Sequence, residues 1–299
     1  MINAGPPNAF GQRALAVETN ASAAEIAAIA ADCLRLEVET FPKPGLVSHL
    51  DSGSHADMNA ATFRRGALAV RPYFRMLAAA GSNGAGMDDL RTIGREAEAA
   101  MLAATGGVNT HRGAIFGLGL FCAAAGACEA GRVRPPKLLG TIVALSWGTD
   151  ILAGSAPDNS HGRDACRRYG AGGARQEAAG GFASVHEIGA PALAAGARLA
   201  SGDAEAGRVQ ACFALIAVVE DTNVLHRGGS AGLRFAQAAA QTFLDAGGVG
   251  RPGWREHAQA VHRAFVARRL SPGGSADLLA MSLFVRAYEE RCLRRAPPH

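Results

Sequence analysis

The chain has 299 residues, enough for one large domain or two smaller ones with a substantial buried core. Hydrophobic residues make up 48% and charged residues 19%, which is typical of a globular protein and excludes an intrinsically disordered one. The net charge of +4 is small and no basic run with interleaved aromatic residues occurs, so the sequence gives no support for nucleic-acid binding.

Helical periodicity dominates the first half of the chain. Ser22 and Glu25 have the spacing of a capping box, which predicts a helix that begins at Ser22 and ends near Phe41, before Pro42. A second helix is predicted from Asp57 onward, with a bend at Pro72. The next predicted helices cover residues 88–105, 109–127 and 135–151.

Residues 154–189 are rich in glycine, arginine and polar residues and lack periodicity, which predicts a long functional or mobile loop. Helices are predicted again over 203–225, 230–246, 254–269 and 275–293. Since no sustained period-2 alternation occurs, the predicted fold class is all-α, a single multi-helix bundle-like domain. Its expected parts are a flexible N-terminal segment (1–20), a helical catalytic domain (21–294) and a tail (295–299).

The six cysteines form no CxxC pair, which favours buried thiols in a reducing compartment over a zinc site or disulfide framework. Residues 1–20 do not have the pattern of a signal peptide. The longest uncharged run, residues 113–128, is shorter than the roughly 20 residues of a membrane-spanning helix. We therefore expect a cytoplasmic protein without a membrane contact.

Unusual polar residues gather at four predicted helix boundaries. The first group, residues 37–58, holds Lys43 between two prolines, together with His55 and Asp57. On a helix Glu37 and Glu39 lie about 200° apart, so at most one of them faces the same site. A polar connector with Asp57 as an N-cap is the alternative interpretation.

The second group, residues 106–113, places His111 and Arg112 at a helix N-terminus, where free N–H groups and the dipole favour a phosphate. Simple capping by Asn109 or Thr110 is the alternative.

In the third group Asp221 is predicted at a helix C-terminus, against the dipole, which suggests a bound cation or catalysis, although a solvated helix end is also possible. In the fourth group Ser275 is a good N-cap, and Asp277 suits the first turn of the helix that follows.

Standard nucleotide-binding and hydrolase motifs are missing. The sequence contains no GxxxxGK[ST], no GxGxxG between a strand and a helix, no HExxH and no GxSxG. A nucleotide would therefore be bound in another way, for example through a metal held by carboxylates from several helices.

Taken in order, five segments resemble the triphosphoribosyl-dephospho-CoA synthase family. They are ETFPKPGLVSHLDSGSHADM (39–58), GGVNTHRGAIF (106–116), GARQEAAGGF (173–182), EDTNVLHRGG (220–229) and LSPGGSADLLA (270–280). The first segment is more similar to the malonate decarboxylase branch than to the citrate lyase branch. Gln176 departs from the pattern, which usually has glycine there.

The resemblance implies an all-helical enzyme that converts ATP and 3′-dephospho-CoA into 2′-(5″-triphosphoribosyl)-3′-dephospho-CoA and adenine, with Mg²⁺ bound to ATP. A separate transferase would attach the product to an acyl carrier protein, and an oligomer is possible. Metal binding or stabilisation of the ribosyl cation is expected of Asp57, Asp221 and Asp277, with Asp221 also catalytic. Proton transfer is expected of Glu177 and His111. Substrate binding is expected of Lys43, His55, Asn109, Arg112, Arg175, Arg227 and Ser275.

Two other functions fit the same residues. One is a metal-dependent hydrolase of N-ribosyl bonds with a similar helical architecture. The other is a non-catalytic helical partner of an acyl carrier protein, which would explain the apolar helices but not the four polar groups.

Overall fold

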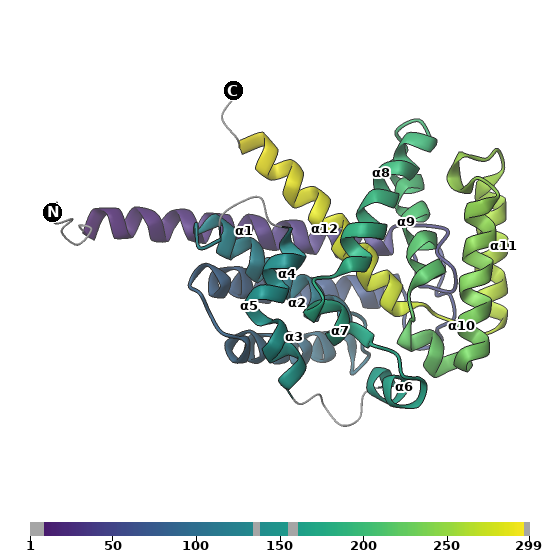
Figure 1. The fold of residues 1–299 in the computed structure, drawn as a ribbon, viewed down its shortest axis with the longest axis horizontal. Helices are drawn as coiled ribbons and strands as arrows, with labels where there is room; N and C mark the ends of the chain where they lie inside the picture. The colour runs from purple at the N-terminus through teal and green to yellow at the C-terminus, as the bar shows by residue number, and fades with distance from the viewer. Residues whose placement is uncertain (1–8, 134–137, 155–160, 296–299) are drawn as a thin grey trace.

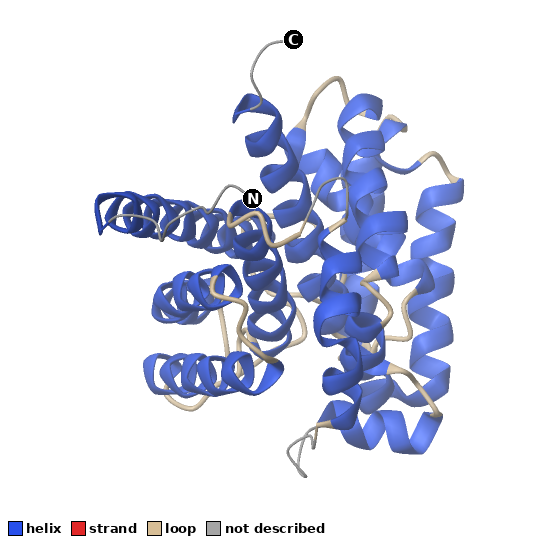
Figure 2. Cartoon of the chain, turned by 60° about the vertical axis from the view of Figure 1, so that its left-hand side comes forward, coloured by secondary structure: helices blue, strands red, loops and turns tan. Residues whose placement is uncertain are grey.

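The computed structural model describes residues 9–133, 138–154 and 161–295, and the regular elements in these ranges are all helices (Figure 2). The predicted all-α fold class is confirmed. The division into an N-terminal segment, a catalytic domain and a tail stays a prediction.

The first half of the chain forms five long helices: α1 (Ala9–Val38), α2 (Ala60–Ser82), α3 (Met87–Thr105), α4 (Arg112–Glu129) and α5 (Leu139–Ala153). α2 packs against α1, α3 and α4. Glycines allow the α2–α4 contact to be close, because a Cβ at Gly81 would overlap the backbone of Ala123, and one at Gly126 would overlap that of Ala78. Ser82 Oγ donates to the Gly126 carbonyl across this interface (3.0 Å).

The second half is made of shorter pieces and then three longer helices. They are α6 (His161–Tyr169), α7 (Gly173–Ala179), the π-helix η1 (Ser184–Gly189), α8 (Ala190–Leu199), α9 (Ala204–Val218), α10 (Thr222–Asp245), the 3₁₀ turn η2 (Gly248–Gly250) and α11 (Trp254–Ala267).

The last helix, α12 (Gly273–Arg295), joins the two halves (Figure 1). It contacts α1 and α4 on one side and α8 and α9 on the other. Phe121 of α4 lies in the core between Phe182, which precedes η1, and Phe284 of α12, with ring centroids 4.8 Å and 6.2 Å away. The first turn of α12 lies in the interior of the protein, since Ser275 is 0% exposed. The polar groups meet at this end of the helix.

Several predicted boundaries are wrong. α1 begins at Ala9 and not at Ser22, whose hydroxyl instead accepts a hydrogen bond from Arg291 of α12 (3.2 Å). α2 begins at Ala60, because Asn59 and not Asp57 is its N-cap. The predicted helix opening at residues 135–136 lies outside the described residues.

The predicted loop over residues 154–189 is also wrong, because its described part contains α6, α7 and η1. α8 was not predicted. The helix predicted over 203–225 is in fact broken: α9 ends at Val218, and α10 starts at Thr222 after a bend of 58°. This break places Asp221 at a helix N-terminus.

By length and composition α4 could cross a membrane, as could α9 and α10 if the bent pair were one span. In the folded chain, however, 72% of the α4 window is buried, and α4 packs against α1, α2, α3, α5 and α12. These contacts are those of the central helix of a protein core.

Candidate active site

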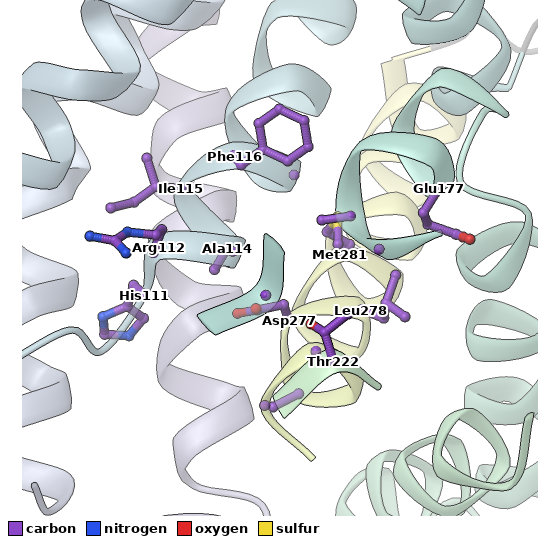
Figure 3. A pocket seen from close by; sticks show the side chains of 18 of the residues that line it. His111, Arg112, Ala114, Ile115, Phe116, Glu177, Thr222, Asp277, Leu278 and Met281 are labelled. Carbon is purple, nitrogen blue, oxygen red and sulfur yellow. The ribbon is translucent and has the colours of Figure 1, made fainter. Parts of the chain in front are cut away.

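A cavity of about 1290 Å³ lies where α3, α4, α7, α10 and α12 meet the loop that follows α1. In the view of Figure 3, His111, the N-cap of α4, and Arg112 are on one wall, Glu177 of α7 is on the other, and Asp277 of α12 lies between them. Residues far apart in the sequence thus share one space.

Asp277 occupies the first turn of α12 and faces the start of α4. Its carboxylate lies against Gly113 and accepts a hydrogen bond from the backbone N–H of Ala114. Burial raises the pKa of Asp277 well above its usual range, and the negative charges of Glu37 and Asp221 raise it further. Three carboxylates therefore act on one another at this end of the cavity.

Asp221 is buried and joins the N-termini of two helices. Its Oδ1 accepts from the N–H groups of Asn223 (2.9 Å) and Val224 (3.3 Å) in α10. Its Oδ2 accepts from the N–H (2.8 Å) and Oγ (3.1 Å) of Ser275 in α12. The sequence interpretation of an acid opposing a helix dipole is wrong, because the dipole here favours the carboxylate.

Glu37, at the end of α1, lines the cavity and forms an ion pair with Lys43. The Lys43 side chain is 0% exposed and does not line the cavity. Burial raises the pKa of Glu37, and the Lys43 ammonium partly offsets that increase. Glu39, by contrast, pairs with Arg35 at the surface (2.5 Å). Lys43 thus supports a carboxylate of the cavity and does not reach the cavity itself.

His111 is buried between α2 and α4. Its Nδ1 is 2.7 Å from Thr110 Oγ1, and its ring packs edge-on against Phe63, with centroids 5.0 Å apart. Its Nε2 is buried without a hydrogen-bond partner. Burial lowers the pKa of His111 to about 3, with a further contribution from the Lys43 charge. The imidazole is therefore neutral at pH 7.

Asn109 and Arg112 close the start of α4. Asn109 Oδ1 accepts from the Arg112 backbone N–H (3.1 Å), and the Arg112 guanidinium pairs with Glu98 of α3, with Nε 2.6 Å from Oε1. Since Ala114 donates to Asp277, part of the predicted phosphate cradle is already occupied by protein groups.

Arg175 and Glu177, both in α7, line another part of the cavity. Arg175 donates to carbonyl oxygens at the C-terminal end of α5, including those of Ile151 (2.8 Å) and Leu152 (2.9 Å). Glu177 Oε1 accepts from the N–H of Ser184, at the start of η1 (2.8 Å).

His55 and Arg227 form a further polar group beside Ser271. Arg227 Nη2 is 3.3 Å from His55 Nδ1, and His55 Nε2 is 2.8 Å from Ser271 Oγ. Burial and the Arg227 charge lower the pKa of His55, while Asp57 opposes that shift. Asp57 is 63% exposed and does not line the cavity.

The family model described as "CitG: ATP:dephospho-CoA triphosphoribosyl transferase" matches residues 23–295. This chain belongs to the CitG family. Its enzyme class, predicted from five segments, is thereby confirmed.

The relatives agree with this assignment. A probable 2-(5″-triphosphoribosyl)-3′-dephosphocoenzyme-A synthase of Stutzerimonas stutzeri is 42% identical over 91% of this chain and 94% of its own length. Similarly named proteins of Pseudomonas savastanoi pv. phaseolicola and Azotobacter vinelandii are 39% and 40% identical, over 90% and 89% of this chain and 93% and 92% of theirs. No solved structure matches the chain.

For this CitG family member, most of the predicted site residues line the one cavity. They are His55, Asn109, His111, Arg112, Arg175, Glu177, Asp221, Arg227 and Asp277. Lys43, Asp57 and Ser275 do not: Lys43 is buried against Glu37, Asp57 is at the surface, and Ser275 is fully buried against Asp221.

Sequence reasoning assigned no role to six charged residues of the lining: Glu37, Arg91, Arg95, Glu98, Arg163 and Glu220. Helix geometry indicated that at most one of Glu37 and Glu39 faces the site, but it could not identify which one. Arg91 and Arg95 are one helical turn apart, a spacing that equally suits a solvated helix face.

A metal would depend on the substrate for most of its ligands. Among the described residues, no group of three His, Cys, Asp or Glu side chains is arranged to hold an ion. Asp221 already accepts four hydrogen bonds, which fill its acceptor positions. Asp277 keeps free acceptor capacity, and Mg²⁺ is commonly held by one or two carboxylates together with substrate phosphates. The lining therefore fits Mg²⁺ bound to a polyphosphate, with Asp277 as the protein ligand.

Proposed function

We propose that this chain transfers the 5-triphosphoribosyl group of ATP to the 2′-hydroxyl of 3′-dephospho-CoA and releases adenine. The observation that carries the proposal is that one cavity, in a chain of the CitG family, combines buried carboxylates with several arginines. Its volume of about 1290 Å³ exceeds the roughly 300–1000 Å³ typical of a site for one small ligand, as two nucleotide substrates require.

The reaction breaks the bond between C1′ of the ribose and adenine and forms a bond from C1′ to the 2′-oxygen. The carbon becomes cation-like, so a fixed negative charge beside it stabilises the transition state. We assign this role to Asp277, which accepts from Ala114 and lies between the two walls of the cavity (Figure 3). Its pKa is raised in the free protein, and the positive charge that develops at C1′ favours its ionised form. Asp221 supports it indirectly, by fixing the start of α12 through Ser275.

One proton leaves the attacking hydroxyl, and one is gained by the departing adenine. His111 has a buried ring nitrogen without a partner on the wall of the cavity, so a substrate group could hydrogen-bond to it. With a pKa of about 3 the ring is neutral at rest and a weak base, which suits a hydrogen-bonding group better than an acid or a base. Glu177 is the other candidate, on the opposite wall in Figure 3.

Mg²⁺, when bound, neutralises charge on the triphosphate. On the protein side, Asp277 would contribute an oxygen ligand, and Arg112 and Arg227 would bind phosphate oxygens. Lys43 is withdrawn from that role because its ammonium is enclosed with Glu37. Asp57 is withdrawn from the metal set because it lies outside the cavity.

Mass spectrometry of ATP and dephospho-CoA after incubation with the chain tests the proposal. We expect free adenine and a product whose mass is that of dephospho-CoA plus the triphosphoribosyl group. Adenine should appear only when dephospho-CoA is present, and Asp277→Asn should abolish its release. Release of adenine and free ribose triphosphate without dephospho-CoA would instead indicate an N-ribosyl hydrolase.

The further use of the product is also part of the proposal. We expect a separate transferase to attach it to the acyl carrier protein of malonate decarboxylase in preference to that of citrate lyase, in the cytoplasm. Supplying the product to each carrier protein with its own transferase, and measuring the mass of each carrier, distinguishes the two branches.

A further inference from the structure

Four arginines from three helices line one part of the cavity. Arg91 and Arg95 belong to α3, Arg163 to α6 and Arg175 to α7. None of them is needed to explain the transfer chemistry at C1′, and only Arg175 stood out in the sequence.

Two of these arginines meet at the C-terminal end of α5. Arg91 donates to the carbonyl oxygen of Asp150, and Arg175 donates to that of Ile151 (2.8 Å). Because consecutive carbonyl groups accept from them, the two guanidinium groups are held near each other. Burial lowers the pKa of Arg175, and the positive charges of Arg91 and Arg163 lower it further, as expected where like charges lie close together.

Among the residues that the structure describes, few carboxylates compensate the charge of Arg91, Arg95 and Arg175. Asp88 pairs with Arg91 (2.7 Å), but its side chain is 96% exposed, so screening by water weakens the pair. Asp164 pairs with Arg167 (2.5 Å), and Glu98 pairs with Arg112. Arg95 is exposed and forms no ion pair with a described residue. Arg91, Arg95 and Arg175 therefore bring a net positive charge to the cavity lining, next to Arg163, which has an interaction of its own.

We propose that Arg91, Arg95, Arg163 and Arg175 form a binding site for a polyphosphate chain. The inference rests on the proposed function, in which ATP brings a triphosphate and dephospho-CoA a diphosphate. Guanidinium groups bind phosphate oxygens through paired, charge-assisted hydrogen bonds. A bound polyphosphate would also remove the repulsion among the arginines, which the free protein has to sustain.

Binding of inorganic tripolyphosphate, measured by titration calorimetry, tests this site without any turnover. Arg95→Gln with Arg163→Gln is the preferred variant, because Arg91 and Arg175 also hold α5. Arg263→Gln, an exposed arginine of α11 that does not line the cavity, is the matched control. We expect the double variant to bind tripolyphosphate at least about tenfold more weakly, and the control to bind it like the parent. Equal affinity in all three proteins would overturn the inference.

Steady-state kinetics then identifies the substrate. A raised KM for ATP alone places the triphosphate at the arginines, and a raised KM for dephospho-CoA alone places the diphosphate there. If neither KM changes in the double variant while transfer proceeds, the site is wrong but the proposed function stands. If the parent shows no transfer but the double variant loses tripolyphosphate binding, the proposed function is wrong but the site stands.

Discussion

The carboxylate of Asp277 lies against the α-carbon of Gly113, so closely that a Cβ at residue 113 would overlap it. The first turn of α12 and the first turn of α4 thus meet through a carboxylate and a residue without a side chain. Gly113 is therefore part of the geometry of the cavity although it has no functional group of its own.

Gly113→Ala should leave the protein folded but lower its turnover by at least about tenfold. Alanine favours the helix by up to roughly 1 kcal/mol over glycine, while its methyl group pushes the Asp277 carboxylate away from its position. Adenine release and urea unfolding measure the two effects separately. Gly86→Ala is the control, because Gly86 does not line the cavity and a Cβ there meets nothing within 4 Å. Normal turnover of Gly113→Ala would show that the position of Asp277 is unimportant.

Asp221→Asn should destabilise the fold, by about 1–3 kcal/mol. The amide keeps one acceptor oxygen, but its NH₂ group would face the N–H and hydroxyl of Ser275 where Oδ2 now accepts. Ser275→Ala removes the hydroxyl alone and should cost less. Urea unfolding of both variants checks the order. A fully stable Asp221→Asn with no activity would indicate a directly catalytic carboxylate.

Lys43→Met should lower the free energy of unfolding by about 3–5 kcal/mol, because it leaves the buried Glu37 without its partner. Glu37→Gln combined with Lys43→Met should recover much of this loss, since neither charge is then buried alone. Chemical unfolding of the two single variants and the double variant gives the coupling between the residues.

The turnover of these Glu37 and Lys43 variants should not follow their stability. The double variant regains stability but still lacks a charge at the cavity, so its adenine release should stay low. If activity returned together with stability, the pair would be purely structural.

His111 should make the protein less stable as the pH falls below 6.5. Its pKa is about 3 in the folded chain and 6.5 as the reference value, so between these values the unfolded chain binds a proton that the folded chain does not. Stability contributed by His111 is present above pH 6.5 and is lost toward pH 3, with a slope of up to about 1.4 kcal/mol per pH unit.

Urea unfolding at pH 7, 6 and 5 measures that slope. His111→Gln should make the decrease smaller by up to the same amount per unit, whatever its stability at pH 7. His49→Gln, at an exposed histidine, is the control. An unchanged slope in His111→Gln would contradict the burial of a neutral ring.

The long amphipathic helices could be predicted from the sequence because each buries a continuous stripe. α3 and α11 are within two residues of their predicted ends, and Gly106 ends α3 in the left-handed conformation. The short helices over 161–189 could not be predicted, since α7 has 7 residues and α6 has 9, too few for a period of 3.6 to emerge.

The break between α9 and α10, before Asp221, could not be predicted for a different reason. No proline or glycine marks it, and apolar residues continue to Val219, so the pattern predicts one helix. The burial of Lys43 could not be predicted either, because it depends on how the chain folds back onto Glu37, six residues earlier. Local sequence limits the backbone around the two prolines but does not identify a partner.

The enclosed pair of Glu37 and Lys43 constrains how this family can change over time. Replacing either residue first leaves a lone charge in the interior, which would remove a large part of the stability that a domain typically has. A lineage can therefore lose the pair only through two nearly simultaneous substitutions or after other changes have made the fold more stable. We expect positions 37 and 43 to vary together across CitG proteins, with both charges kept or both replaced.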